Sequence, residues 1–235
     1  MSKLTYKNGI KDGVPIALGY FAVSIAFGVT ATNLGVPYFI SILISLTNLT
    51  SAGQLAGVAI VAVLGTVLEI ILTQLVINAR YFLMSLTLSQ KLDGNFKTLD
   101  RFLCAFGITD EIFAVAVSKK EVSKNYMYGL MLLPIIGWTS GTAIGAILGN
   151  VLPQIIVNAL SIALFAMFIA IVIPATLEYK KIFPVILISA GLSCCFYFIP
   201  LLSTISSGIA YIFCALISAI IGAILFPIEV QDSDE

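Results

Sequence analysis

Long apolar runs, with few polar residues inside them, set the pattern of this chain. A helix that crosses a bilayer needs about 20 apolar residues. The runs predict six such spans, at residues 14–34, 53–77, 126–149, 153–177, 182–199 and 205–228. They are continuous rather than alternating, which is typical of helices and not of β-barrel strands. The predicted fold is all-α: a polytopic helical membrane protein with about six full spans plus re-entrant or broken half-helices.

Two apolar stretches contain polar interruptions. In SLTNLTSAGQ, the side chains of Asn48, Ser51 and Gln54 are too polar for the middle of a lipid-facing helix. In CAFGITDEIFAV, Gly107 interrupts the run shortly before two adjacent acids. Irregular backbone at membrane depth is tolerated only where protein buries it or where it lines a cavity. We therefore expect broken or re-entrant segments at both places.

Positive charge predicts which segments face the cytoplasm. Lysine and arginine gather in four regions, which the positive-inside rule makes cytoplasmic: residues 3–11, 91–101, 119–124 and 180–181. The stretch 102–118 lies between two of them, so we expect it to enter and leave the membrane on one side. Its predicted half-helices cover residues 99–106 and 110–118, with the break near Gly107.

The remaining segments complete the predicted topology. The N-terminus (residues 1–12) and the acidic tail (residues 229–235) are expected in the cytoplasm. The stretch 81–90 is too short to span, and it either lies at the membrane interface or continues the preceding helix. Residues 1–235 are expected to form a single integral membrane transport domain.

Composition supports a membrane protein and excludes several chemistries. The chain is 60% hydrophobic and 10% charged, whereas soluble domains carry about 25% charged residues. Its net charge of zero gives no bulk attraction to nucleic acid. It has no histidine, and its four cysteines lie in apolar runs, which argues against zinc, haem and Ser-His sites. We expect no metal and no cofactor, and a lipid bilayer as the surroundings.

Asp110 and Glu111 are the first candidates for a site. A carboxylate at the bilayer centre costs about 2.5–3.5 kcal/mol on insertion scales, and two adjacent carboxylates repel one another. If Asp110 begins a half-helix, its carboxylate can accept from the free N–H groups there, with Thr109 as a further cap. Either the two acids only cap a helix at the cytoplasmic surface, or they form a proton or substrate site in a cavity.

Three polar residues of the second span and its extension are further candidates. Glu69 lies well inside the predicted span and is either protonated against lipid or faces a polar interior. Asn78 and Arg80 follow at the cytoplasmic end. Arg80 is either a snorkelling anchor, a partner of Asp110 or Glu111, or a bidentate holder of a substrate carboxylate.

Glycine recurs every four residues in GWTSGTAIGAILG, a spacing that lets helix backbones approach closely. We assign this face to helix packing, against another helix of this chain or of a partner. Its members are Gly137, Gly141, Gly145 and Gly149.

Five landmarks occur in order along the chain. They are GVPIALGY at residues 13–20 with AFG at 26–28, SLTNLTSAGQ at 45–54, NARY at 78–81, TDE at 109–111 and WTSGTAIGAILG at 138–149. In this order and spacing the chain resembles the AzlC family of branched-chain amino acid permeases over nearly its full length. Two positions depart from the family pattern, which commonly has histidine where this chain has Tyr81 and glycine where it has Ser51.

The resemblance implies an exporter of branched-chain amino acids (leucine, isoleucine and valine), in some members also of methionine. It also implies a multi-pass protein of the bacterial inner membrane, driven by the proton motive force, with a small hydrophobic AzlD-like subunit as partner. If the family histidine moves protons, the carboxylates must do so here.

Three functions remain open from the sequence. The leading hypothesis is a secondary amino-acid transporter, not an enzyme, whose substrate and proton pathway draws on Asn48, Ser51, Gln54, Glu69, Asn78, Arg80, Thr109, Asp110 and Glu111. An intramembrane enzyme would need two carboxylates that face each other across a site. A scaffold subunit that does not transport has no need of the insertion cost of buried charges.

Overall fold

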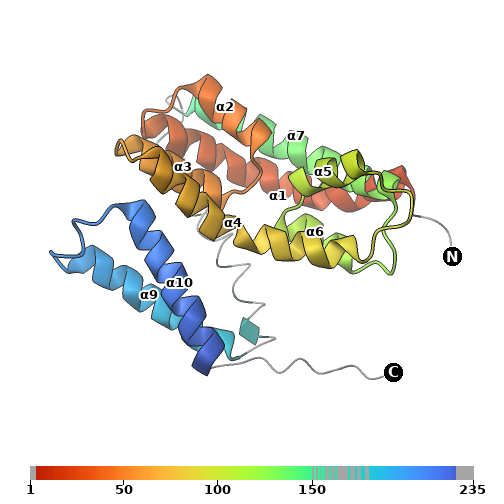
Figure 1. Cartoon of the computed structure of the whole chain (residues 1–235). Coiled ribbons are helices and arrows are strands. Elements are labelled where there is room, and N and C mark those ends of the chain that lie inside the picture. Colours follow the sequence, from red (N-terminus) through yellow and green to blue (C-terminus); the bar gives the residue numbers. More distant parts are fainter. Residues whose placement is uncertain are drawn as a thin grey trace. The chain divides into compact units, whose positions relative to one another are not determined.

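The computed structural model of the chain describes residues 4–149 and 180–225, together with isolated positions between 151 and 177. Most of the predicted span 153–177, the end of the span 205–228 and the tail 229–235 lie outside the described residues. The described helices, labelled in Figure 1, are α1 (Tyr6–Asn33), α2 (Tyr38–Thr47), α3 (Ala52–Ala62), α4 (Val67–Ser89), α5 (Thr98–Phe106), α6 (Asp110–Val117), α7 (Lys124–Leu148), α9 (Ile182–Phe198) and α10 (Ser207–Leu225).

The prediction of a polytopic helical membrane protein is confirmed. Within the described part of the chain, α1, α4, α7 and α10 are long and apolar enough to cross a membrane. The helix α9 coincides with the predicted span 182–199 but, at 17 residues, is shorter than these four. The chain divides into two compact units, Met1–Val58 with Asn78–Phe165 (unit 1) and Ala59–Ile77 with Ala166–Glu235 (unit 2).

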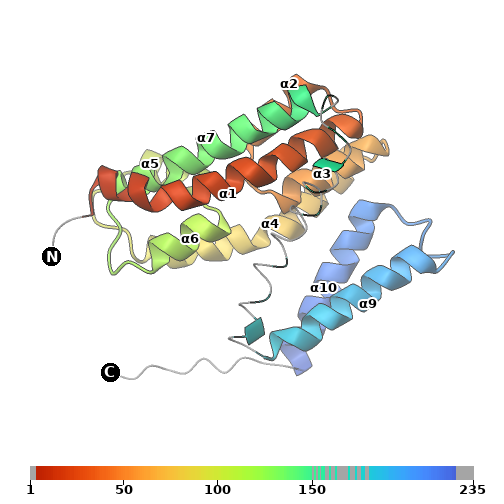
Figure 2. The same ribbon diagram turned by 180° about the vertical axis from the view of Figure 1, so that it is seen from behind.

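In unit 1, α1 and α7 run side by side along their length, as Figure 2 shows. The predicted glycine face, Gly137, Gly141 and Gly145 of α7 with Gly149 directly after it, lies against α1, because a Cβ added to any of them would meet α1 atoms. Gly137 would place a methyl 2.6 Å from the Ala17 carbonyl oxygen, and Gly13 of α1 would place one 2.7 Å from the Leu130 carbonyl oxygen. The glycine face therefore packs within this chain, along the α1 residues Ala17, Phe21, Ile25 and Val29.

Both predicted interruptions are present in unit 1. The helices α2 and α3 are separated by residues 48–51, where Ser51 has a φ of 42°. The helices α5 and α6 are separated by residues 107–109, where buried Gly107 lies against the side chain of Met131. Met131 and Ile108 belong to the buried apolar cluster on which α5, α6 and α7 converge.

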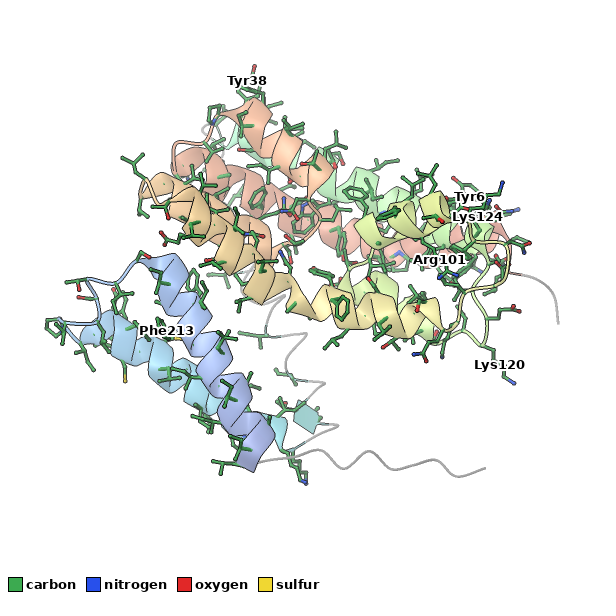
Figure 3. All side chains as sticks on the ribbon, viewed as in Figure 1. Tyr6, Tyr38, Arg101, Lys120, Lys124 and Phe213 are labelled. Carbon is green, nitrogen blue, oxygen red and sulfur yellow. The ribbon has the colours of Figure 1, made fainter. Side chains whose placement is uncertain are left out.

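The stretch 102–118 leaves from one end of unit 1 and returns to the same end. Its flanks meet there: the Asp93 N–H donates to the Val122 carbonyl at 3.0 Å, and the Val122 N–H donates to the Lys91 carbonyl at 2.8 Å. Figure 3 shows Tyr6, Arg101, Lys120 and Lys124 at this end and Tyr38 at the opposite one. An ion pair of 3.0 Å between Lys119 and Asp12 joins α1 to the same region.

The prediction of one continuous span over residues 53–77 is wrong. The helix α3 ends at Ala62 and α4 begins at Val67. At the break, Leu64 takes a φ of 56° and the Gly65 N–H donates back to the Ile60 carbonyl at 2.9 Å, which is the geometry of a helix C-cap. Thr66 then caps α4, because its hydroxyl accepts from the Glu69 N–H at 3.2 Å.

Two other boundaries differ from the hydrophobic pattern. The stretch 81–90 continues α4, which settles the alternative that the sequence left open. The helix α1 begins at Tyr6, eight positions before the apolar run, because Thr5 and Asn8 form a capping box.

In unit 2, α9 and α10 pack together, and the rings of Phe196 and Phe213 stack with their centroids 6.4 Å apart.

Candidate functional site

The first turn of α6 positions the two adjacent acids. Thr109 is the residue that caps this helix, because its hydroxyl accepts from the Ile112 N–H at 3.4 Å. Asp110 and Glu111 follow in the first turn, where the positive end of the helix dipole favours negative charge. Consecutive helical residues point about 100° apart, so the two carboxylates reach different neighbours.

Asp110 pairs with Arg80. The Arg80 Nη1 atom lies 2.7 Å from the Asp110 Oδ2 atom, and the two side chains are 36% and 24% exposed. Of the alternatives left open for Arg80, the structure shows the pairing with Asp110. The pair is therefore partly exposed rather than fully buried.

Glu111 is held by a hydroxyl group. The Tyr20 hydroxyl, on α1, donates to Glu111 Oε2 and lies 2.6 Å from the Thr109 Oγ1 atom. Tyr20 is buried, and its ring meets the Trp138 ring edge-on at a centroid distance of 5.4 Å. Among the described residues, Glu111 forms no ion pair with a lysine or an arginine.

Tyr20 is a member of this group that sequence reasoning missed. Its signal is a tyrosine in the middle of a predicted span, because a buried phenol hydroxyl requires a hydrogen-bond partner. The partners come from residues far along the chain, Thr109 and Glu111. Only the fold brings them together.

Tyr81 packs on the same group. The Arg80 guanidinium carbon lies 5.0 Å from the centroid of the Tyr81 ring, within the range of a cation–π contact. The Arg80 Nη2 atom lies 3.4 Å from the Tyr81 hydroxyl. Asn78 lies half-buried on α4, one turn before Tyr81.

The candidates in the first interruption form a local structure. The Gln54 side chain accepts from the Ser51 N–H at 3.3 Å and donates to the Ser45 hydroxyl at 3.0 Å. Ser45 in turn lies 2.7 Å from the Thr142 hydroxyl of α7. Gln54 is 2% exposed, so its amide fixes the break to α7. Asn48 is half-buried and ends α2.

Glu69 occupies a separate position, in unit 2. Its side chain is buried, and its Oε1 atom accepts from the Gly208 N–H at the start of α10, at 3.2 Å. Of the two alternatives for Glu69, its burial and its backbone partner favour a polar interior. The carboxylate instead caps a helix N-terminus, where negative charge is favourable.

The arrangement does not form a carboxylate dyad. Asp110 turns to Arg80 and Glu111 turns to Tyr20, whereas a dyad requires two acids that share one site. Within the ranges that the structure describes, no three histidine, cysteine or acidic side chains gather to hold a metal ion.

Charged groups at broken helices within a polytopic membrane protein are typical of membrane transport proteins. The family model described as "AzlC protein" matches residues 15–152. The chain belongs to the AzlC family, which is associated with transport rather than enzymatic catalysis.

The chain is also similar in sequence to three individual proteins. It is 30% identical to an uncharacterized membrane protein of Archaeoglobus fulgidus, over 72% of this chain and 75% of that protein. It is 32% identical to the inner membrane protein YgaZ of Escherichia coli, over 64% of this chain and 63% of that protein. It is 28% identical to the branched-chain amino acid transport protein AzlC of Bacillus subtilis, over 75% of this chain and 70% of that protein. No solved structure matches the chain.

Proposed function

We propose that this chain is the large subunit of a proton-coupled exporter of leucine, isoleucine and valine, with methionine as a further candidate substrate. The observation that carries the proposal is the ion pair of 2.7 Å between Arg80 and Asp110, at the start of a broken helix. The printed name of the Bacillus subtilis relative supports the substrate class.

The ion pair offers one positive and one negative group, which match the carboxylate and the ammonium group of a zwitterionic amino acid. The Arg80 guanidinium takes the substrate carboxylate in its bidentate fork, and the Asp110 carboxylate takes the substrate ammonium group. Opening the pair to admit the zwitterion leaves each protein charge with an opposite charge beside it. Such an exchange avoids the cost of an unpaired charge at a partly buried site.

Glu111 is the group that carries the proton. Asp110 has a permanent cation beside it, whereas the described partner of Glu111 is the neutral Tyr20 hydroxyl. A carboxylate without a cation can take up and release a proton without breaking an ion pair. One proton enters on Glu111 from one side of the membrane and leaves on the other as one amino acid crosses.

A small AzlD-like membrane subunit is the partner, and the complex lies in the inner membrane with both termini in the cytoplasm. The name of the Escherichia coli relative supports the inner membrane. The gathering of Arg101, Lys120 and Lys124 at one end of unit 1 supports the orientation.

A flux experiment tests the proposal. Liposomes containing the chain with its small partner are loaded with labelled leucine, and an inward proton gradient is imposed. We expect gradient-dependent efflux that the Asp110→Asn variant loses. The matched control is Asp93→Asn, which neutralises a carboxylate in the connection between α4 and α5, hydrogen-bonded to Asn95; it should retain full flux.

Two outcomes would overturn the proposal. Absence of gradient-dependent efflux with both subunits present would exclude a proton-coupled exporter. Equal efflux from liposomes that contain the small partner alone would make this chain a scaffold.

A further inference from the structure

Tyr20 contacts the second interruption of unit 1 and shares a buried cluster with the first. Its hydroxyl contacts Thr109 and Glu111 at the break between α5 and α6. Its ring belongs to a buried apolar cluster with Trp138 and Leu49. Leu49 lies in the break between α2 and α3 and is 6% exposed. One side chain of α1 thus joins two broken segments that are far apart in the sequence.

The geometry points to Tyr20 as a positioning residue that couples protonation of Glu111 at the second break to the packing of Leu49 at the first. The inference rests on the proposed function only in taking Glu111 as the proton carrier. It adds the route by which a proton at one break alters the other.

The physical step is an exchange of hydrogen-bond partners. With Glu111 ionised, the Tyr20 hydroxyl donates to its carboxylate, a charge-assisted bond about twice as strong as a neutral one. Once Glu111 takes up a proton from solution, that advantage is lost, and the hydroxyl can turn to the Thr109 Oγ1 atom, 2.6 Å away. The proton stays on Glu111 until it is released to the other side, so no other group gains or loses one.

The ring of Tyr20 carries this change to the first break. Trp138 meets the ring edge-on at 5.4 Å, and its indole Nε1 is buried without a hydrogen-bond partner among the described residues. Packing against neighbouring side chains therefore holds the indole, with no polar contact to fix it. The hydroxyl changes partner by turning about its own C–O bond, so the ring responds through the lost bond to Glu111. A Tyr20 side chain with one partner fewer shifts in its pocket, and a shift of its ring repacks Trp138, which shares a buried cluster with Leu49.

The groups that face Glu111 define what else responds to pH there. Tyr20 comes from α1, Tyr81 comes from α4, and Asp110, which pairs with Arg80 of α4, precedes Glu111 on α6. Trp138 of α7 does not titrate. Asp110 and Arg80 are paired with each other. Glu111 is therefore the carboxylate of this group that the Tyr20 hydroxyl contacts directly.

The chain contains one tryptophan, so Trp138 fluorescence reports on the coupling without a label. The chain is placed in lipid nanodiscs, and Trp138 emission is recorded as pH is varied. We expect a pH-dependent change of emission that Glu111→Gln abolishes. Tyr20→Phe, which keeps the ring and removes the hydroxyl, should abolish it as well.

A matched control removes a similar hydroxyl elsewhere. The Tyr126 hydroxyl of α7 donates to the Asp12 carboxylate of α1 at 2.7 Å, so Tyr126→Phe breaks another tyrosine–carboxylate bond of α1, made with α7 instead of α6. It should leave the pH-dependent emission of Trp138 unchanged.

The outcomes separate this inference from the proposed function. If Tyr20→Phe keeps the wild-type emission change, the coupling role is wrong even where leucine flux is intact. If Tyr20→Phe and Glu111→Gln both lose the change while Tyr126→Phe keeps it, the coupling stands even where no flux is found. A loss in Tyr126→Phe equal to that in Tyr20→Phe would also overturn the assignment.

Discussion

The guanidinium of Arg80 and the carboxylate of Asp110 lie 2.7 Å apart, although one belongs to the long helix α4 and the other to the first turn of α6. Breaking a buried ion pair by removing one partner costs about 3–5 kcal/mol. This pair is about one-third exposed on the Arg80 side, so solvent screening reduces the expected cost to about 1–2 kcal/mol.

We predict that Arg80→Gln and Asp110→Asn each reduce leucine efflux by about tenfold or more, which corresponds to about 1.4 kcal/mol. The same two changes should also lower the stability of the protein. In the double variant these two losses of stability should not add, because either change alone removes the same ion pair.

Melting temperatures of the single and double variants in detergent measure the coupling energy between Arg80 and Asp110. Losses of stability that add fully would show that the ion pair contributes nothing to stability.

The strained backbone at Ser51 predicts a stabilising substitution. Ser51 has a φ of 42°, a conformation that costs a non-glycine residue about 1–3 kcal/mol. Ser51→Gly should therefore raise the melting temperature by a few degrees, less a small loss from the greater freedom of the unfolded chain. Ser85→Gly, inside α4, is the matched control and should lower it, because glycine weakens a helix interior by about 1 kcal/mol. Equal shifts of one sign would contradict the strain at Ser51.

The contact between α1 and α7 predicts that glycine replacements differ sharply in effect. At Gly141 an added methyl would overlap the Ser24 hydroxyl and the Phe21 carbonyl oxygen, whereas at Gly191 of α9 nothing lies within 4 Å. Gly141→Ala should lower the melting temperature, by an overpacking cost of about 1–3 kcal/mol. Gly191→Ala should leave it unchanged or raise it, since alanine favours helix. A neutral Gly141→Ala would mean that the two helices are not in close contact.

The cap on α10 predicts a local effect of Glu69. Its carboxylate accepts from the Gly208 N–H at 3.2 Å. Glu69→Ala leaves that buried donor unpaired, which costs about 1–3 kcal/mol. Hydrogen exchange of the Gly208 amide should be faster in this variant, and Glu69→Gln, which keeps an acceptor oxygen, should be intermediate. An unchanged rate in Glu69→Ala would exclude the cap.

The sequence predicted the two interruptions because each carries a visible signal. Gly107 stands between two positively charged flanks, and polar residues from Asn48 to Gln54 interrupt an apolar run. The break between α3 and α4 escaped because Val63 and Leu64 continue the apolar pattern through it. The available signal was the pair Gly65–Thr66, with Glu69 three residues after Thr66, a helix-start pattern inside a hydrophobic run.

The choice of partners at the site could not be predicted. Whether Arg80 reaches Asp110 or Glu111 depends on the rotation of α6 about its axis, which tertiary packing sets. The contact between Tyr20 and Glu111 joins α1 to α6 across the fold, and no local pattern encodes it. The sequence named Thr109 as a further cap beside Asp110, and the Thr109 hydroxyl does accept from the Ile112 N–H.

The central claim is that Glu111 carries the proton that is exchanged for the amino acid. Liposomes containing the chain and its small partner receive an imposed leucine gradient, and a trapped pH dye follows proton movement. Wild-type protein and the Asp93→Asn control should move protons against leucine, whereas Glu111→Gln should exchange labelled leucine for unlabelled leucine without moving protons. Leucine-driven proton movement in Glu111→Gln at the wild-type rate would contradict the account.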